Sequence, residues 1–209
     1  MTDNYYVFDG SALCAQIRTL RKRNRTFEGR KLDPVQYVNY LHRSGSLADL
    51  HGGQFKRATF YFPKGDEDAA ADYLRMPKLN TPGLIRDIHF KYCGEKIKGS
   101  KPFARWVETT VPPRWQDRVS KSEKGIDIEI CCDALKLVSV SRLNRLFLLT
   151  NDADFVPLCR TLKELGTNVS LLFLSEFQRP NEALLREADT YDVVPVAQLQ
   201  SLFHPPISS

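Results

Sequence analysis

Four aspartates of this chain lie beside apolar runs, at positions from which they could reach one end of a sheet. Asp9 follows Tyr-Tyr-Val-Phe, and Asp152 and Asp154 follow the buried-strand pattern Arg-Leu-Phe-Leu-Leu-Thr. Asp127 lies near the start of a helix-like run. Oxygen ligands suit Mg²⁺ or Mn²⁺, and several carboxylates this close stay ionised only beside a cation. The pattern indicates a metal site, where the ion polarises a phosphate and a water attacks it in line.

Other polar residues near these aspartates could support the same chemistry. Thr150 and Asn151 directly precede Asp152 and could hydrogen-bond a carboxylate or the attacking water. Lys124 could neutralise charge, and Ser11 stands two positions after Asp9. Asp133 lies six residues beyond Asp127, about 120° around a helix, so we expect it to support the structure rather than bind the ion.

The elements that must position these residues alternate between strand and helix patterns, which predicts a parallel sheet with helices on its faces. We expect strands at 5–8, 58–62, 87–93, 145–150, 168–174 and 193–194. We expect helices at 11–22, 34–41, 66–75, 123–140, 153–165 and 181–188. Because the carboxyl ends of parallel strands share one crevice, Asp9 and Asp152 should meet there. The apolar neighbours Ile130, Cys131 and Ala134 should turn Asp127 toward the sheet.

Each aspartate also has a simpler structural interpretation. Asp152 and Asp154 could cap the following helix, because aspartate is a favoured N-cap residue. Asp9 precedes a glycine and could serve a turn, and Asp127 could interact with the helix dipole. The joint placement of the four residues favours the metal site.

Length and composition predict one domain over residues 1–203, followed by a flexible tail at 204–209. The chain has 209 residues, of which 42% are hydrophobic and 26% are charged, enough for a single core. No apolar run is long enough to cross a membrane, and the N-terminus lacks the order of a signal peptide. The five cysteines contain no C-x-x-C pair, which disfavours disulfides and zinc and fits a cytoplasmic protein.

The net charge of +5 is unevenly distributed, with basic clusters at 18–31 and in an irregular arm at about 94–124. Cations beside aromatic residues can follow a phosphate backbone and stack on bases. Equally, the arginines could end a solvated helix and the tryptophans could pack the arm onto the core. The candidate RNA-binding residues are Arg21, Arg23, Arg25, Arg105, Trp106, Arg114, Trp115 and Lys121.

Several enzyme classes are disfavoured by missing motifs. The chain has no G-x-x-x-x-G-K, G-x-S-x-G or G-x-G-x-x-G pattern, which argues against P-loop NTPases, α/β-hydrolases and dinucleotide enzymes. A phosphatase of the haloacid dehalogenase type would need a second acid at position 11, where Ser11 stands.

Three segments together resemble the motifs of NYN domains, the LabA-like branch of the PIN-like nucleases. They are Tyr-Val-Phe-Asp-Gly-Ser-Ala-Leu at 6–13, Lys-Gly-Ile-Asp-Ile-Glu-Ile-Cys-Cys-Asp-Ala-Leu at 124–135 and Leu-Leu-Thr-Asn-Asp-Ala-Asp-Phe-Val-Pro-Leu at 148–158. The resemblance implies an α/β, PIN-like α/β/α sandwich with a central, mostly parallel sheet. It also implies metal-dependent RNA cleavage, with metal ligation by Asp9, Asp127, Asp152 and Asp154.

Two positions depart from that family pattern. Ala12 stands where family members commonly have asparagine, and Thr150-Asn151-Asp152 stands in place of Ser-Gly-Asp. Neither change removes a carboxylate. The leading hypothesis is therefore a metal-dependent ribonuclease that uses Mg²⁺ or Mn²⁺ and acts on RNA, with self-association left open. The alternative is a catalytically weak or inactive PIN-like module that binds RNA or a protein partner.

Overall fold

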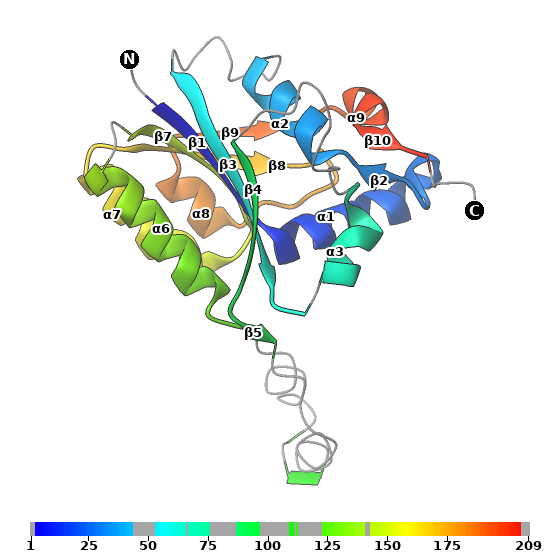
Figure 1. The fold of residues 1–209 in the computed structure, drawn as a ribbon, viewed down its shortest axis with the longest axis horizontal. Coiled ribbons are helices and arrows are strands. Elements are labelled where there is room, and N and C mark those ends of the chain that lie inside the picture. Colours follow the sequence, from blue (N-terminus) through cyan, green and yellow to red (C-terminus); the bar gives the residue numbers. More distant parts are fainter. Residues whose placement is uncertain are drawn as a thin grey trace.

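The central sheet of the protein contains only parallel strands. The computed structural model describes residues 3–43, 53–65, 67–75, 87–96, 109–110, 112, 123–140 and 143–205. Within these residues the six-stranded sheet has the order β4-β3-β1-β7-β8-β9 (Figure 1). Its strands are β1 (Asp3–Asp9), β3 (Gln54–Pro63), β4 (Ile88–Cys93), β7 (Leu143–Leu149), β8 (Asn168–Phe173) and β9 (Thr190–Val193).

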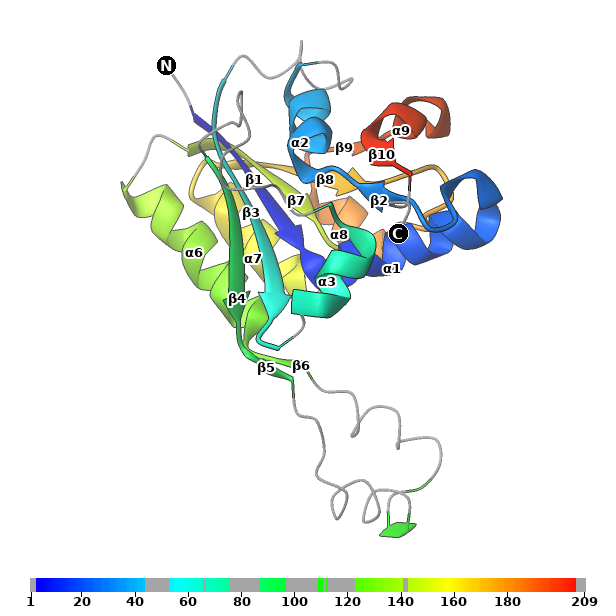
Figure 2. The same cartoon turned by 45° about the vertical axis from the view of Figure 1, so that its right-hand side comes forward.

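Helices cover both faces of this sheet, so the chain forms an α/β/α sandwich (Figure 2). One face packs against α1 (Gly10–Arg23), α2 (Pro34–Arg43), α3 (Glu67–Tyr73) and α9 (Val196–Leu202). The other face packs against α6 (Ile126–Val140), α7 (Val156–Glu164) and α8 (Glu182–Glu187). The short 3-10 helices η1 (Arg25–Phe27) and η2 (Ala153–Phe155) precede β2 (Lys31–Leu32) and α7.

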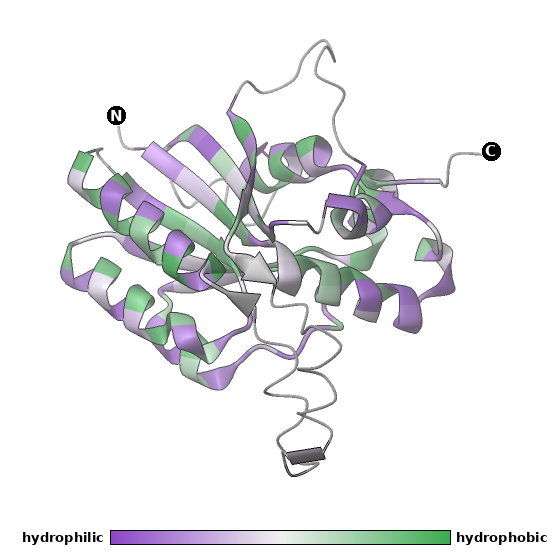
Figure 3. Cartoon of the chain, turned by 60° about the horizontal axis from the view of Figure 1, so that its bottom comes forward, coloured by the Kyte–Doolittle hydropathy of each residue, from purple (hydrophilic) through white to green (hydrophobic). Residues whose placement is uncertain are grey.

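Alternation of side chains along β1 supplies both cores. Tyr6 and Phe8 point into the α1 side, and Tyr5 and Val7 into the α6 side, as expected for successive residues of a strand. Phe8 stacks on Phe60 with 4.2 Å between ring centroids, which ties β1 to its neighbour β3. Hydrophilic and hydrophobic residues are interspersed along the helices (Figure 3), and in α1 the buried Leu13, Ile17 and Leu20 lie on one face.

Two short ladders lie outside the main sheet and correct the sequence predictions. β2 (Lys31–Leu32) pairs with β10 (Phe203–His204), so His204, expected in a flexible tail, lies in a strand. β5 (Glu95–Lys96) pairs with β6 (Glu123–Lys124), so the helix expected from residue 123 begins only at Ile126. No helix in the described ranges combines the length and apolar character needed to span a membrane.

Candidate functional site

Asp9 occupies the carboxyl end of the central strand β1 and is almost completely buried, with 7% of its surface exposed. It is also the N-cap of α1, since its Oδ1 accepts a hydrogen bond from the Ala12 backbone N–H at 3.1 Å. Its Oδ2 accepts a hydrogen bond from the buried Thr150 hydroxyl at 3.2 Å. Capping α1 does not by itself exclude metal ligation by Asp9, because one carboxylate can accept hydrogen bonds and bind a cation at the same time.

Position 10, directly after Asp9, has room only for glycine. A Cβ added to Gly10 would lie 2.4 Å from both the Phe62 ring and the Tyr61 backbone carbonyl oxygen. A methyl group there would push the first turn of α1 away from β3. Gly10 therefore lets the chain enter α1 at once and keeps Asp9 directed at the end of β7.

Asp152 is linked to Asp9 through Thr150. The Thr150 hydroxyl oxygen accepts a hydrogen bond from the Asp152 backbone N–H at 3.2 Å. Asp152 in turn caps η2, with its Oδ1 accepting the Asp154 N–H at 3.0 Å. Asp152 and Asp154 are exposed, so their carboxylates can change rotamer at little cost. The order Asp9, Thr150, Asp152 places two carboxylates at adjacent strand ends.

Asp127 lies in the first turn of α6 and is half-buried. Ile126, Ile130 and Ala134 of this helix are buried against the sheet. The helix packs against β1, β7 and η2, which carry the other candidate residues at their ends. Burial raises the pKa of the Cys131 thiol, and the negative charge of Asp127 one turn earlier raises it further.

The donor set is chemically suited to a divalent cation, since it consists of carboxylate oxygens and one threonine hydroxyl. Among the residues that the structure describes, however, no three His, Cys, Asp or Glu side chains form a ready metal-binding group. One Asp152 carboxylate oxygen caps η2, and the side chain is exposed. Lys124 pairs with Glu95 through its backbone, and its side chain lies outside the described part.

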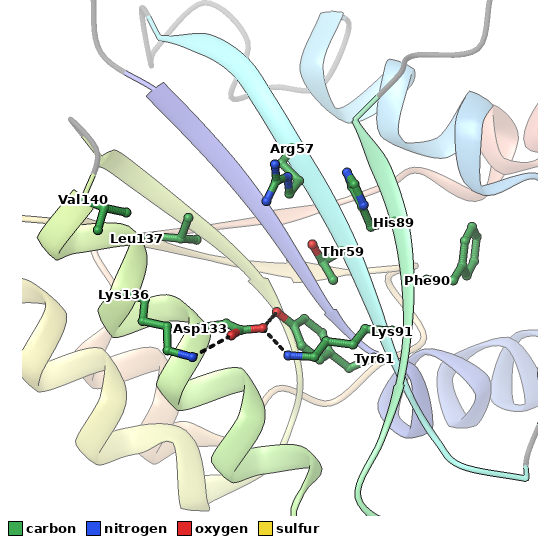
Figure 4. Close-up of a pocket in the computed structure, with 10 residues that line it drawn as sticks. All are labelled: Arg57, Thr59, Tyr61, His89, Phe90, Lys91, Asp133, Lys136, Leu137 and Val140. Atoms are coloured by element: carbon green, nitrogen blue, oxygen red, sulfur yellow. Dashed lines mark hydrogen bonds and ion pairs between the residues drawn. The ribbon is translucent and has the colours of Figure 1, made fainter.

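A second polar cluster joins α6 to β3 and β4 (Figure 4). Of its residues, only Asp133 was singled out from the sequence. The Lys91 ammonium donates to Asp133 at 2.7 Å and to Glu129 at 2.8 Å, and the Tyr61 hydroxyl donates to Asp133 at 2.9 Å. Burial raises the pKa of Asp133, but the hydrogen bonds from Lys91 and Tyr61 outweigh this effect and leave the pKa lowered. The cluster fixes α6 on the sheet, which agrees with the supporting role expected for Asp133.

The loop after β8 lies beside the Asp152 segment and contains Phe177 and Arg179, which were not predicted as candidate residues from the sequence. The Asn151 side-chain amide donates to the Arg179 carbonyl at 3.0 Å, and its oxygen accepts the Asn181 N–H at 2.7 Å. Phe177 and Arg179 are exposed in this loop. Their position after the carboxyl end of a predicted strand was the signal that could have identified them.

The basic residues expected to bind RNA fall into two groups. Arg21 donates to the backbone carbonyls of Arg30 and Asp72, and its guanidinium lies 4.9 Å from the centroid of the Tyr73 ring. It therefore ties α1 to α3, whereas Arg23 and Arg25 are exposed. All three follow Asp9 by at least twelve residues, roughly 18 Å along a helix. Arg105, Trp106, Arg114, Trp115 and Lys121 lie outside the described residues.

Comparisons with known proteins place the chain in a family. The family model of the NYN domain matches residues 30–194. No curated protein matches the chain. Among solved structures, the chain is similar to a protein of unknown function from Vibrio parahaemolyticus RIMD 2210633, with 14% identity, a TM-score of 0.48 and 93% of each chain covered.

The family match covers most of the chain and includes Asp127, Asp152 and Asp154, but it begins after Asp9. It is compatible with the LabA-like branch without identifying that branch. NYN domains belong to the PIN-like nuclease superfamily and are generally ribonuclease-like. PIN-like nucleases typically use divalent metals. Because the NYN family model matches far more than half of the sequence, this chain belongs to the NYN domain family.

Proposed function

We propose that this chain is a metal-dependent ribonuclease that hydrolyses phosphodiester bonds at the carboxyl edge of its sheet. The observation that carries the proposal is the hydrogen-bonded sequence from Asp9 through Thr150 to Asp152. Two aspartates from distant parts of the chain thereby lie at adjacent strand ends, which form the usual binding edge of a parallel sheet. Membership of the NYN family supports the nuclease class.

In this proposal Asp9 and Asp152 would hold Mg²⁺ or Mn²⁺, and Asp127 and Asp154 would complete the ligand set. The bound ion would supply charge neutralisation for the phosphate and acidify a water. Thr150 keeps the Asp9 carboxylate oriented by its hydrogen bond. Asn151 fixes the neighbouring loop, so that Phe177 and Arg179 border the same edge and could hold an RNA strand by stacking and charge.

The test compares RNA degradation by the wild type, Asp9→Asn and Asp152→Asn in Mg²⁺ or Mn²⁺. Asparagine keeps a side-chain oxygen for capping, so both variants should fold while losing at least about 100-fold in rate. Asp72→Asn is the matched control, because Asp72 is an exposed aspartate at the far end of α3. Mn²⁺ titration of the same proteins should show weaker binding only in the two site variants. Equal rates in all four proteins would defeat the assignment.

The absence of a ready three-carboxylate group among the described residues favours one alternative, a module that binds RNA without cutting it. RNA binding that persists in EDTA, with no cleavage in Mg²⁺ or Mn²⁺, would select this alternative.

A measurement of RNA binding tests the role of the loop after β8. Phe177→Ala should weaken binding of a single-stranded RNA about tenfold, because base stacking contributes about 1–3 kcal/mol per base. Tyr191→Ala removes another exposed aromatic ring, from β9, and should leave the affinity unchanged. An equal effect of the two substitutions would argue against a specific role for Phe177.

A further inference from the structure

A hollow of about 420 Å³ lies between α6 and the face of β3 and β4, apart from the aspartate edge (Figure 4). Its floor is built by the strand register, which pairs Thr59 with His89 and Tyr61 with Lys91. Arg57 continues the same row of side chains along β3. We call this hollow the flank pocket. Its volume is in the range of pockets that hold small organic ligands.

The two ends of the flank pocket differ in charge. At one end Lys91 is neutralised by Asp133 and Glu129, and Lys136 lies 3.8 Å from Asp133. At the other end stand Arg57 and His89, both exposed, and neither forms an ion pair with any residue that the structure describes. The Arg57 guanidinium is therefore available to an anion, and a guanidinium binds phosphate oxygens through two parallel hydrogen bonds.

The wall opposite Arg57 and His89 is apolar. It is formed by Leu137 and by Val140, whose surface is 79% exposed (Figure 4). A ligand that covered these two side chains would remove apolar surface from water. The combination of a cationic floor and an aliphatic wall suits a ligand with one anionic group and one flat, weakly polar body.

We propose that the flank pocket binds a nucleotide unit. Its phosphate would lie against Arg57, with a hydrogen bond from His89, and its base would cover Leu137 and Val140. Tyr61 pairs with Asp9 in the sheet, whereas Arg57 lies four residues earlier, about 13 Å along the strand. A phosphate on Arg57 is therefore separate from one held at Asp9. The unit could come from free nucleotide or from an RNA strand, and the second source rests on the proposed ribonuclease function.

The first experiment titrates adenosine 5′-monophosphate into the full chain by calorimetry. EDTA is present, so that no divalent cation is bound at the aspartate edge. Arg57→Gln should weaken binding at least tenfold, and Val140→Asn should weaken it a few-fold. Lys56→Gln is the matched control, since Lys56 is the preceding exposed cation on β3 and does not line the pocket. No binding by the wild type at millimolar concentration, or equal losses in Arg57→Gln and Lys56→Gln, would overturn the proposal.

The second experiment identifies the source of the nucleotide. A single-stranded RNA of ten nucleotides is titrated into the same proteins in EDTA. Loss of RNA affinity in Arg57→Gln, with competition by adenosine 5′-monophosphate, would show that the pocket holds part of an RNA strand. Unchanged RNA affinity, with mononucleotide binding still dependent on Arg57, would assign it to free nucleotide. Failure of RNA cleavage would overturn the ribonuclease proposal and leave the mononucleotide result standing.

Discussion

Thr150 is the residue that connects the two strand ends of the candidate site. Its hydroxyl donates to Asp9 and accepts from the Asp152 N–H, and the residue is fully buried. Thr150→Val keeps the shape and removes both hydrogen bonds, so the free energy of unfolding should fall by about 2 kcal/mol. Urea denaturation measures this change.

Thr150→Ser provides the control because it keeps the hydroxyl and loses only a buried methyl group, at a cost of about 1 kcal/mol. Only the valine variant should also lose nuclease activity. If Thr150→Ser lowered the free energy of unfolding as much as Thr150→Val, the hydroxyl would not be the stabilising group.

Asp133 makes stability depend on acid pH. Its pKa in the folded protein lies below the ordinary value of 3.8, because the hydrogen bonds from Lys91 and Tyr61 outweigh the effect of burial. A lowered pKa contributes stability that is complete above the ordinary value and is lost as the pH falls through the folded value. The wild type should therefore exceed Asp133→Asn in stability at neutral pH.

This advantage should shrink below about pH 4 and vanish at the lowest pH at which both proteins fold. Thermal unfolding between pH 7 and pH 2 follows the difference. Asp72→Asn, at an exposed site on α3, should parallel the wild type throughout. A difference between wild type and Asp133→Asn that stayed constant with pH would show that the carboxylate's charge is not the stabilising feature.

At the scale of the element, α6 determines where Asp127 points. Ile130 is fully buried on its inner face, while Ile128, two positions earlier, is 68% exposed. Ile130→Ala should lower the free energy of unfolding by about 3 kcal/mol, and Ile128→Ala should change it by less than about 0.5 kcal/mol. Guanidinium denaturation of the two variants measures the contrast. Similar losses would mean that α6 is rotated so that Ile128 is buried as well, which would also change the direction of Asp127.

Most of the main elements were predictable because their signals are local. The apolar run before Asp9 and the glycine after it predicted a strand that ends where a helix begins, and the structure confirms both elements. The proline at position 34 predicted the start of α2. The expected α/β sandwich is likewise confirmed.

The missed elements depend on partners distant in sequence. Glu123 and Lys124 have no strand-like pattern, and only their pairing with Glu95 and Lys96 makes them extended. Likewise, Lys91 shows no sign in the sequence that it meets Asp133, because strand register and helix rotation together create that contact. The direction of the Asp9 carboxylate toward Thr150 also required the fold.

At the scale of the whole molecule, the C-terminal segment closes the α1 side of the core. Phe203 is buried, lies 5.0 Å from Phe27 between ring centroids, and pairs with Leu32 through its backbone. Phe203→Ala should therefore lower the free energy of unfolding by about 3 kcal/mol.

Phe177→Ala removes the same side chain from a position where 36% of its surface is exposed, so its loss of stability should be clearly smaller than that of Phe203→Ala. Calorimetric melting of both variants makes the comparison. A stable Phe203→Ala protein would mean that β10 contributes little to the fold.

The central position of β1 has a consequence for synthesis on the ribosome. Tyr5 of this strand pairs with Arg57 on one side and with Leu146 on the other, so its second neighbour follows about 140 residues later. At translation rates of about 5–20 residues per second, the nascent chain waits roughly 7–30 s before that neighbour is made. During this interval one edge of a strand rich in tyrosine, valine and phenylalanine has no native partner. Chains arrested before β7 should therefore bind holdase chaperones more strongly than chains released after it.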